Sequence, residues 1–205
     1  MILGSGISGN GIEPLLESDF VEIVETDVAF GPRTCLICDA HDIPFPNNSF
    51  DAIIVQAVLE HVVDPYRCAD EIHRVLGDKG LVFADTPFMQ QVHMREYDFT
   101  RFTFLGHRRL FRRFEEISSG ISCGPGMALA WSFQYFLLSF TTSLLLRKFL
   151  VFFAGLTTFF LKYFDHYLIR KVGSLDAASS YYFIGRKGNE TLSDRELLKQ
   201  YRGAF

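Results

Sequence analysis

The stretch that decides the fold is Met1–Phe30, which reads MILGSGISGNGIEPLLESDFVEIVETDVAF. It opens with the apolar pair Ile2-Leu3, and the glycine-rich turn GSGISG follows directly at residues 4–9. A helix-compatible segment comes next, and then Val21–Val24, which alternates like a strand and leads to the acid Asp27. A strand, a glycine turn, a helix, a second strand and a terminal acid, in this order, indicate a nucleotide-binding βαβ unit.

The glycine turn fits the pattern G-x-G-x-x-G through Gly4, Gly6 and Gly9. Glycine adopts backbone angles that other residues avoid, and without a Cβ atom it lets a ligand approach the main chain closely. Asp27 lies near the spacing expected for an acid that accepts hydrogen bonds from ribose hydroxyls. This unit alone predicts either a dinucleotide or S-adenosylmethionine as ligand, and a glycine-rich turn without a ligand remains an alternative.

Composition limits the classes of function. The chain has 205 residues and a net charge of −4, which suits one α/β domain with room for an insertion and gives nucleic-acid binding little electrostatic support. A cluster of four arginines, at positions 108, 109, 112 and 113, is equally compatible with a solvated helix face. Cys35 and Cys38 form a C-x-x-C in an apolar run without a second pair, so we expect buried small residues there and predict no metal site.

The beginning of the chain bears on its location. No signal peptide is visible, because Met1 leads straight into the nucleotide unit. Only three residues precede the glycine turn, so we expect a shortened first strand. Unpaired cysteines fit a reducing compartment. The sequence predicts a cytoplasmic protein, with attachment to the inner face of a membrane as one option.

Further strands follow the nucleotide unit. Thr34–Cys38, Ala52–Val55 and Leu81–Ala84 are short apolar runs, and the last of them is expected to break at Asp85–Pro87. Phe114–Ile117 is a candidate sixth strand. Strands that alternate with helices indicate a parallel, doubly wound sheet.

One helix between these strands has clear boundaries in the sequence. Tyr66–Leu76 carries apolar residues at helical spacing. Asp64 is placed to cap its start and Gly77 to end it.

Several features, taken together, resemble a class I S-adenosylmethionine-dependent methyltransferase. Within that class they are similar to the "type 11" group, which has a D-x-x-x-LPFP-x-x-SFD loop followed by an EH pair. The matching features are the glycine turn, Asp27, Asp39, the loop Asp42–Asp51 and the pair Glu60-His61. The resemblance implies an α/β fold with a mostly parallel, Rossmann-like, seven-stranded sheet, and S-adenosylmethionine as cofactor.

The resemblance also implies roles for residues in the first half of the chain. The backbone of the glycine turn would approach the methionine and ribose parts of the cofactor, and Asp27 would bind the ribose hydroxyls. Asp39 would face the adenine amino group, with Ala40 and His41 beside the ring. The alternative for Asp39 is an aspartate that bonds its own loop backbone, which is common.

Three more candidate cofactor contacts lie beyond the fourth strand. Gln56, Glu60 and His61 follow it directly, at the edge where ligands of open α/β sheets bind. For Glu60, a helix-capping or loop-bracing role is equally compatible with the sequence.

Methyl transfer from a sulfonium mainly requires the nucleophile, the methyl group and the sulfur to be held in line. A general base is needed only when the acceptor arrives protonated. His93, in the polar loop after the fifth strand, is the candidate base; the alternative is a solvent-facing loop histidine. Tyr97, Asp98 and Arg101 are candidates for a structural hinge in the same loop.

The composition changes in the C-terminal part of the chain. Ala128–Leu146 carries no charge and Phe149–Leu161 is again apolar; the second run is only roughly 20 Å long as a helix, too short to span a bilayer comfortably. Ser180–Arg186 resembles the final, antiparallel strand of the fold, and its return to the sheet excludes a single membrane span. We therefore expect a hydrophobic helical hairpin inserted before the last strand. The hairpin is a lid over the site, a membrane-interface element or a buried or dimer contact.

The sequence thus predicts a methyltransferase core at 1–122, a hydrophobic insertion at 123–173, a final core strand at 174–188 and a surface tail at 189–205. The expected function is methyl transfer from S-adenosylmethionine to a small or lipid-like acceptor, with membrane contact through residues 128–161 as an option. One rival is an NAD(P)-binding oxidoreductase on the same glycine unit. The other is a membrane-associated, non-catalytic protein with a methyltransferase-like fold.

Overall fold

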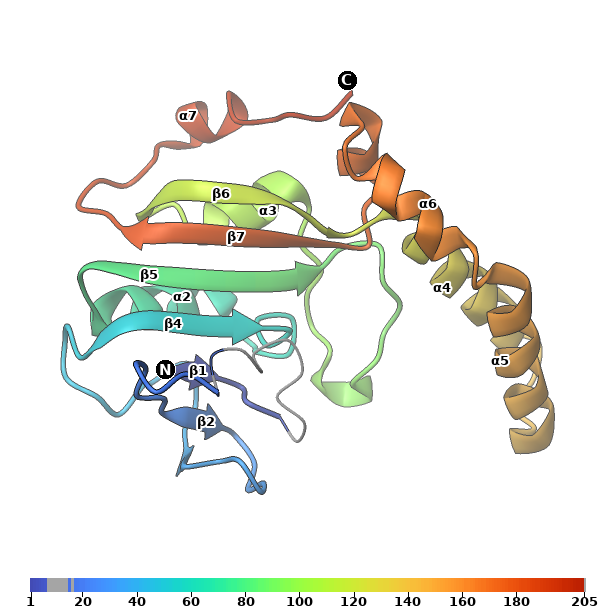
Figure 1. Cartoon of the computed structure of the whole chain (residues 1–205), viewed down its shortest axis with the longest axis horizontal. Helices are drawn as coiled ribbons and strands as arrows, with labels where there is room; N and C mark the ends of the chain where they lie inside the picture. Colours follow the sequence, from blue (N-terminus) through green and yellow to red (C-terminus); the bar gives the residue numbers. More distant parts are fainter. Residues whose placement is uncertain (7–14, 16, 205) are drawn as a thin grey trace.

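The computed structural model describes residues 1–6, 15 and 17–204 of the chain. In this part of the chain a seven-stranded sheet has the strand order β3-β2-β1-β4-β5-β7-β6 (Figure 1). Strands β1 to β5 pair in parallel, and β7 lies antiparallel between β5 and β6. This confirms the predicted mostly parallel, Rossmann-like sheet. The strands are β1 (Ile2–Leu3), β2 (Glu25–Asp27), β3 (Leu36–Ile37), β4 (Phe50–Gln56), β5 (Leu76–Pro87), β6 (Phe114–Cys123) and β7 (Ser180–Lys187).

The first half of the sheet is shorter than the sequence suggests. The predicted second strand is present but shorter than expected, since β2 begins only at Glu25 and does not include Val21–Val24. The Ile2 amide still donates to the Val24 carbonyl at 2.9 Å, but β1 has just two residues, which pair with Glu25 and Thr26. The expected break at Asp85–Pro87 is wrong, because β7 continues the pairing of β5 as far as Pro87.

The centre of the sheet is buried on one face. Ile53, Val55, Val82 and Ala84, from the neighbouring strands β4 and β5, are fully buried, and they share a face because they lie two positions apart in each strand and are paired across the strands. Ile54 and Phe83, which point to the opposite face, are half-buried. This pair of strands supports the site described below, because both end at the same edge of the sheet.

Helices α2 (Pro65–Val75) and α3 (Phe104–Leu110) lie on the same face of the sheet (Figure 1). The predicted cap of α2 is confirmed: Asp64 Oδ1 accepts a hydrogen bond from the Arg67 amide at 3.1 Å. The expected end at Gly77 is wrong, since Leu76 is already extended and starts β5.

Two groups of residues singled out in the sequence differ in burial. Cys35 is exposed and Cys38 buried, so the expectation of two buried cysteines holds only for the second. They are three positions apart across β3, and an odd spacing places side chains on opposite faces of a strand. In the arginine cluster, Arg108 is buried and donates to the carbonyls of Phe111 and Phe114 at 2.7 and 3.1 Å, so it braces the turn into β6.

Three helices occupy the predicted insertion between β6 and β7. They are α4 (Pro125–Leu138), α5 (Leu144–Thr158) and α6 (Leu161–Leu168), and α4 packs against both of the others. They start from the edge at which β4 and β5 end and project beyond the sheet (Figure 1). We call α4, α5 and α6 together the helical insertion. The short helices η1 (Arg95–Tyr97), η2 (Val172–Ala177) and α7 (Asp194–Leu198) complete the described fold.

A buried carboxylate joins two helices of the insertion. Asp165, on α6, accepts hydrogen bonds from the amides of Gly126 and Met127 at 2.7 and 3.0 Å. These are first-turn amides of α4, whose own cap residue Gly124 makes no side-chain capping bond. The contact is close: a Cβ atom at Gly126 would lie 2.3 Å from the Leu161 carbonyl oxygen. Asp165 therefore caps α4 from a different helix.

The surface of the insertion is unusually apolar. Large exposed side chains on α5 and its flanks include Leu144, Leu145, Phe149, Phe152 and Leu156. Within the part of the chain that the structure describes, no single helix is long and apolar enough to cross a membrane. The bent pair α5 and α6, at 46° to one another, meets that length and composition together.

His107 gives stability a predictable dependence on pH. It lies in α3 among the rings of Phe102, Phe111 and Phe183, and burial lowers its pKa from 6.5 to about 3. Between these values the unfolded chain binds a proton at His107 and the folded chain does not. The contribution of His107 to the free energy of unfolding should therefore fall as the pH falls through this window, by about 2 kcal/mol between pH 7 and pH 5. Buried Glu60 and Asp85, whose pKa values are raised to about 7 and about 6, contribute with the opposite sign, so the effect of His107 is measured as a difference between variants.

Chemical denaturation at both pH values measures this dependence. Between pH 7 and pH 5, the change in the free energy of unfolding should differ by about 2 kcal/mol between His107→Phe and the wild type, whereas the exposed His166→Gln should match the wild type. An unchanged pH dependence in His107→Phe would contradict the assignment.

Candidate active site

The ends of β1 and β2 bring the glycine turn and Asp27 together. Gly4 has φ +74°, and a Cβ atom there would lie 2.3 Å from Val58 Cγ2, so only glycine fits. Gly6 also has a positive φ, and the place of its missing Cβ has no neighbouring atom within 4 Å. Its amide donates to Asp27 Oδ2 at 3.0 Å. Gly9, the third glycine of the pattern, lies outside the described residues.

Asp27 retains capacity for a ligand. Its Oδ1 accepts from the Ala29 amide at 3.0 Å, and its Oδ2 from Gly6. Each carboxylate oxygen can accept a second bond, and the residue is only half-buried. A pair of hydroxyl groups presented at this edge could therefore be bound by the carboxylate.

Asp39 and His41 are bonded to each other. Asp39 Oδ1 accepts from the His41 amide at 2.9 Å and lies 2.6 Å from His41 Nδ1. These hydrogen bonds lower the pKa of Asp39. The His41 ring continues to the start of α2, where its Nε2 accepts from the Asp64 amide at 3.0 Å. The bond from the His41 amide is the one expected if Asp39 only stabilises its own loop. The Asp39 side chain is nevertheless 67% exposed, so a ligand can still reach it. Ala40 beside it is buried.

Beyond β4 the chain turns sharply. Gln56 is exposed at the end of the strand. Ala57 has φ +52°, a backbone conformation that residues other than glycine rarely adopt. The Ala57 amide donates to the carbonyl of Asp85 on β5 at 3.0 Å. This turn directs Glu60 and His61 toward the loop that follows β5.

Residues 88–103, which we call the β5–α3 loop, are attached to that turn by backbone hydrogen bonds. The amides of Phe99 and Thr100 both donate to the Glu60 carbonyl, at 2.8 and 3.1 Å. His61 Nδ1 lies 2.8 Å from the Tyr97 carbonyl oxygen and donates to it. Two segments about forty residues apart are thus fixed to each other by their main chains.

Inside this loop, Asp98 and Arg101 form a two-bond ion pair, with Arg101 Nη2 2.6 Å from Asp98 Oδ2. Arg101 also donates to the carbonyls of Gln90 and Gln91 at 2.9 and 3.1 Å. The His93 amide donates to Asp98 Oδ2 at 2.9 Å. This pair therefore sets the path of the loop and the position of His93.

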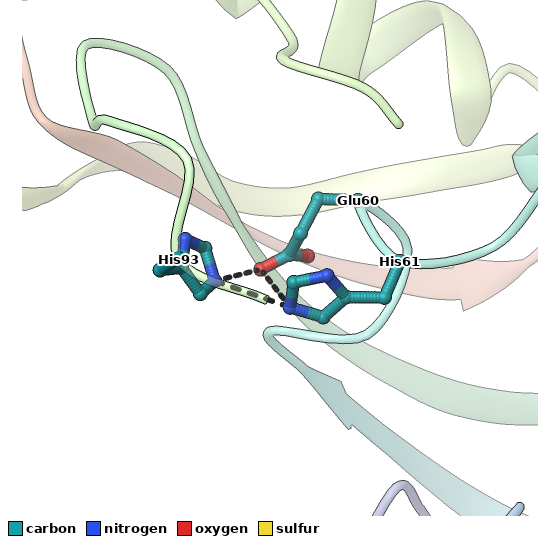
Figure 2. A group of neighbouring side chains, drawn as sticks. All are labelled: Glu60, His61 and His93. Atoms are coloured by element: carbon teal, nitrogen blue, oxygen red, sulfur yellow. Dashed lines mark hydrogen bonds and ion pairs between the residues drawn. The ribbon is translucent and has the colours of Figure 1, made fainter. Parts of the chain in front are cut away.

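Glu60, His61 and His93 converge at the centre of the site, as Figure 2 shows. His61 Nε2 lies 3.1 Å from His93 Nε2, and Glu60 Oε1 lies 3.6 and 3.8 Å from these two nitrogens. Glu60 is fully buried, and neither carboxylate oxygen has a hydrogen-bond partner among the described residues. Burial raises the pKa of Glu60 to about 7 and lowers that of His61.

The sequence predicted these three residues for different roles, two as cofactor contacts and one as base. Their convergence follows from topology: Glu60 and His61 come after β4, His93 after β5, and neighbouring parallel strands end at the same edge.

A cavity of about 620 Å³ lies next to this cluster. Its walls come from the β5–α3 loop, including Phe88, Val92 and Asp98, and from Ser132 and Tyr135 of α4. Gln91 Nε2 donates to Ser132 Oγ at 3.1 Å, which joins the loop to the helix. Sequence reasoning missed both α4 residues, because they lie in a segment whose composition indicated only an apolar helix.

Comparison with known proteins adds the family. Residues 4–84 match the model of the family described as "Methyltransferase domain". This part of the chain is thus similar to a methyltransferase domain. The match begins at the glycine turn and ends within β5, so it includes Asp27, Asp39, Glu60 and His61. No curated protein matches the chain.

Solved structures similar to this chain confirm the fold. One is a protein from Galdieria sulphuraria assigned as a sarcosine dimethylglycine methyltransferase, with 15% identity, a TM-score of 0.57, and coverage of 92% of this chain and 77% of that one. A second is 1,6-didemethyltoxoflavin-N1-methyltransferase from Burkholderia thailandensis, with 10% identity, a TM-score of 0.54, and coverage of 92% and 71%. A third is the [4+2]-cyclase SpnF, with 15% identity, a TM-score of 0.54, and coverage of 91% and 74%. At these identities the likeness shows the fold alone.

The ion pair in the β5–α3 loop can be tested by exchange. Asp98→Ala should leave Arg101 without its carboxylate and loosen the loop, because a hydrogen bond to a charged group contributes about 1.5–3 kcal/mol. The Phe99 and Thr100 amides should then exchange with solvent about 10- to 100-fold faster, as measured by hydrogen–deuterium exchange. Glu96→Ala, an exposed acid in the same loop, is the control. Equal exchange in both variants would show that the pair does not hold the loop.

Proposed function

We propose that the chain is an S-adenosylmethionine-dependent methyltransferase that acts on a small or lipid-like acceptor. The observation that carries the proposal is the family match over residues 4–84, because the residues proposed for the cofactor lie within it. The hydrogen bond from the Gly6 amide to Asp27 supports the cofactor role. It holds the glycine turn, proposed for the methionine and ribose parts, next to the carboxylate proposed for the ribose hydroxyls.

For the cofactor, we assign the methionine and ribose parts to the backbone of Gly4 and Gly6, together with Gly9. Asp27 would accept from the ribose hydroxyls. Residues of the next strand end, namely Asp39, Ala40 and His41, would surround adenine. Gln56, Glu60 and His61 complete the proposed cofactor side of the site.

The acceptor would occupy the cavity beside the β5–α3 loop. A cavity of about 620 Å³ lies within the range typical of sites for drug-sized molecules. Phe88, Val92 and Tyr135 give it apolar walls, while Gln91 and Ser132 offer hydrogen-bonding groups. Since Ser132 and Tyr135 belong to the apolar helical insertion, we favour an acceptor with a greasy portion. Among the structurally similar proteins, the enzyme from Burkholderia thailandensis was crystallised with 1,6-didemethyltoxoflavin and S-adenosylhomocysteine, a small acceptor and the demethylated cofactor.

The transfer itself would need little covalent help. The methyl group of a sulfonium is already activated, so the protein mainly aligns the acceptor atom with the methyl carbon and sulfur. If the acceptor is protonated, we propose His93 as the base, since it is half-buried, follows the cavity residue Val92 in the chain and is bonded through its amide to the cavity residue Asp98.

We also propose that the helical insertion contacts a membrane surface. It carries many exposed leucines and phenylalanines, and it projects beyond the sheet (Figure 1). Exposed apolar areas of this kind mark sites of protein or membrane contact. An interfacial position would let a lipid-like acceptor reach Ser132 and Tyr135 along α4.

Calorimetric titration with S-adenosylhomocysteine tests the cofactor assignment. Wild-type protein should bind it, and Asp27→Ala should bind at least about 10-fold more weakly, as expected for loss of hydrogen bonds to a charged group. In Asp27→Asn one side-chain oxygen remains and can still accept a backbone amide of the turn. This variant therefore shows whether the loss of binding in Asp27→Ala comes only from a weakened turn. The exposed Asp78→Ala is the control.

NADH serves as the competing ligand in the same experiment. Binding of NADH without S-adenosylhomocysteine would favour the oxidoreductase, and binding of neither would favour the non-catalytic protein. Either result would overturn the methyltransferase proposal.

Vesicle sedimentation tests the membrane contact. Wild-type protein should pellet with phosphatidylcholine–phosphatidylglycerol vesicles. The double variant Leu145→Ser/Phe152→Ser should partition at least about 10-fold less, because burying one large apolar side chain contributes about 1.5–3 kcal/mol. Phe30→Ser, an exposed phenylalanine far from the insertion in sequence, is the control. A wild-type protein that stays in the supernatant would refute the contact.

A further inference from the structure

The cluster of Glu60, His61 and His93 has the chemistry of a metal site. It offers one carboxylate oxygen and two imidazole nitrogens, all within 4.8 Å of one another, from two different segments of the chain (Figure 2). We propose that these three side chains bind one divalent transition-metal ion, of the zinc, cobalt or iron type, beside the acceptor cavity. The family match does not assign a metal site.

The distances between the ligand atoms suit such an ion. The His61 Nε2 to His93 Nε2 distance is 3.1 Å, and Glu60 Oε1 lies 3.6 and 3.8 Å from them. Ligands bound at about 2.0–2.1 Å in a tetrahedron are separated by roughly 3.3 Å. An ion could therefore enter with side-chain shifts of a few tenths of an ångström.

Glu60 provides an independent observation. Its side chain is fully buried, and both of its carboxylate oxygens lack a hydrogen-bond partner in the part of the chain that the structure describes. The nearby cation Arg101 is bonded instead to Asp98 and to the carbonyls of Gln90 and Gln91. A buried carboxylate without a partner is unfavourable, and a bound cation would satisfy it.

The imidazole of His61 is oriented for ligation. Its Nδ1–H donates to the Tyr97 carbonyl at 2.8 Å, which leaves the lone pair of neutral His61 on Nε2, the atom that faces Glu60 and His93. Most metal-binding histidines donate their other ring nitrogen to a carbonyl or carboxylate in this way, because the bond fixes the tautomer and the ring orientation. The His93 ring is held by the loop: its Nδ1 lies 3.5 Å from Asp98 Oδ2, and 3.4 Å from both the Gln91 carbonyl oxygen and Arg101 Nη2.

The donor set selects the class of metal. Imidazole nitrogen favours zinc, copper, iron and nickel, whereas calcium and magnesium prefer sites made of oxygen alone. Three protein ligands leave a coordination position open, as in catalytic rather than structural sites.

The position of the cluster suggests what the open site would hold. Val92 and Asp98, on either side of His93 in the loop, line the acceptor cavity. If the proposed function is correct, a hydroxyl of the acceptor would bind the ion there and lose its proton to solvent. The resulting oxygen would form a bond to the methyl carbon as the bond from that carbon to sulfur breaks. In this case His93 would act as a metal ligand and not as the base.

Cobalt titration tests the site without relying on methyl transfer. Wild-type protein, stripped of metal by a chelator, should bind one Co²⁺ with visible d–d absorption, and added Zn²⁺ should displace it. Glu60→Gln, His61→Ala and His93→Ala should each bind at least about 10-fold more weakly. The exposed His166→Ala should bind like the wild type.

S-adenosylhomocysteine binding by the same variants separates folding from ligation. His93→Ala should keep that binding while it loses cobalt, which would show an intact fold without the metal site. Absence of cobalt binding by wild-type protein, or equal binding in all three ligand variants, would overturn the inference. Stoichiometric cobalt binding without any S-adenosylhomocysteine binding would leave the metal site standing and refute the cofactor assignment.

Discussion

The attachment of the β5–α3 loop to the Glu60 backbone is the interaction on which the site depends. Two amides, those of Phe99 and Thr100, share the Glu60 carbonyl, and His61 returns a hydrogen bond to the Tyr97 carbonyl. Backbone groups at a buried position must be paired, so this contact is a condition of folding as well as of function. It encloses the Glu60 side chain, brings His93 against His61 and shapes one wall of the cavity.

The same attachment explains how a minimal first half of the sheet can support a site. β1 and β3 have two residues each, yet β4 and β5 are long, and the residues on one of their faces are fully buried. Their rigid register fixes the two turns that meet at Glu60. Precision at the site therefore comes mainly from the centre of the sheet.

The sequence was informative where local chemistry determines structure. The Asp64 cap of α2, the paired glycine turn and acid, and the final antiparallel strand were all predicted from residues near one another or from a family pattern. Strand lengths were predicted incorrectly. Val21–Val24 alternates like a strand, but β1 is too short to pair with most of it, and Asp85–Pro87 has the composition of a break but is paired by β7.

Contacts between distant segments were beyond the sequence alone. Nothing near Ser132 or Tyr135 indicates that they border a cavity with residues from the β5–α3 loop. Likewise, His93 could be singled out as a polar loop residue, but its meeting with Glu60 and His61 required the order of β4 and β5 in the sheet. The similarity to both methyltransferases and the cyclase SpnF makes the same point at the level of function: this fold permits several reactions, and the side chains at its edge decide among them.

The bond from Asp165 to the start of α4 has a mechanical consequence. It ties α6 to α4, and α4 in turn contacts the β5–α3 loop through Ser132 and through the Tyr135 hydroxyl, 3.4 Å from the Val92 carbonyl oxygen. These contacts form an unbroken path from α6, through α4, to the wall of the cavity. Under the proposed function, a surface that binds the helical insertion would therefore be mechanically connected to the wall that faces the acceptor.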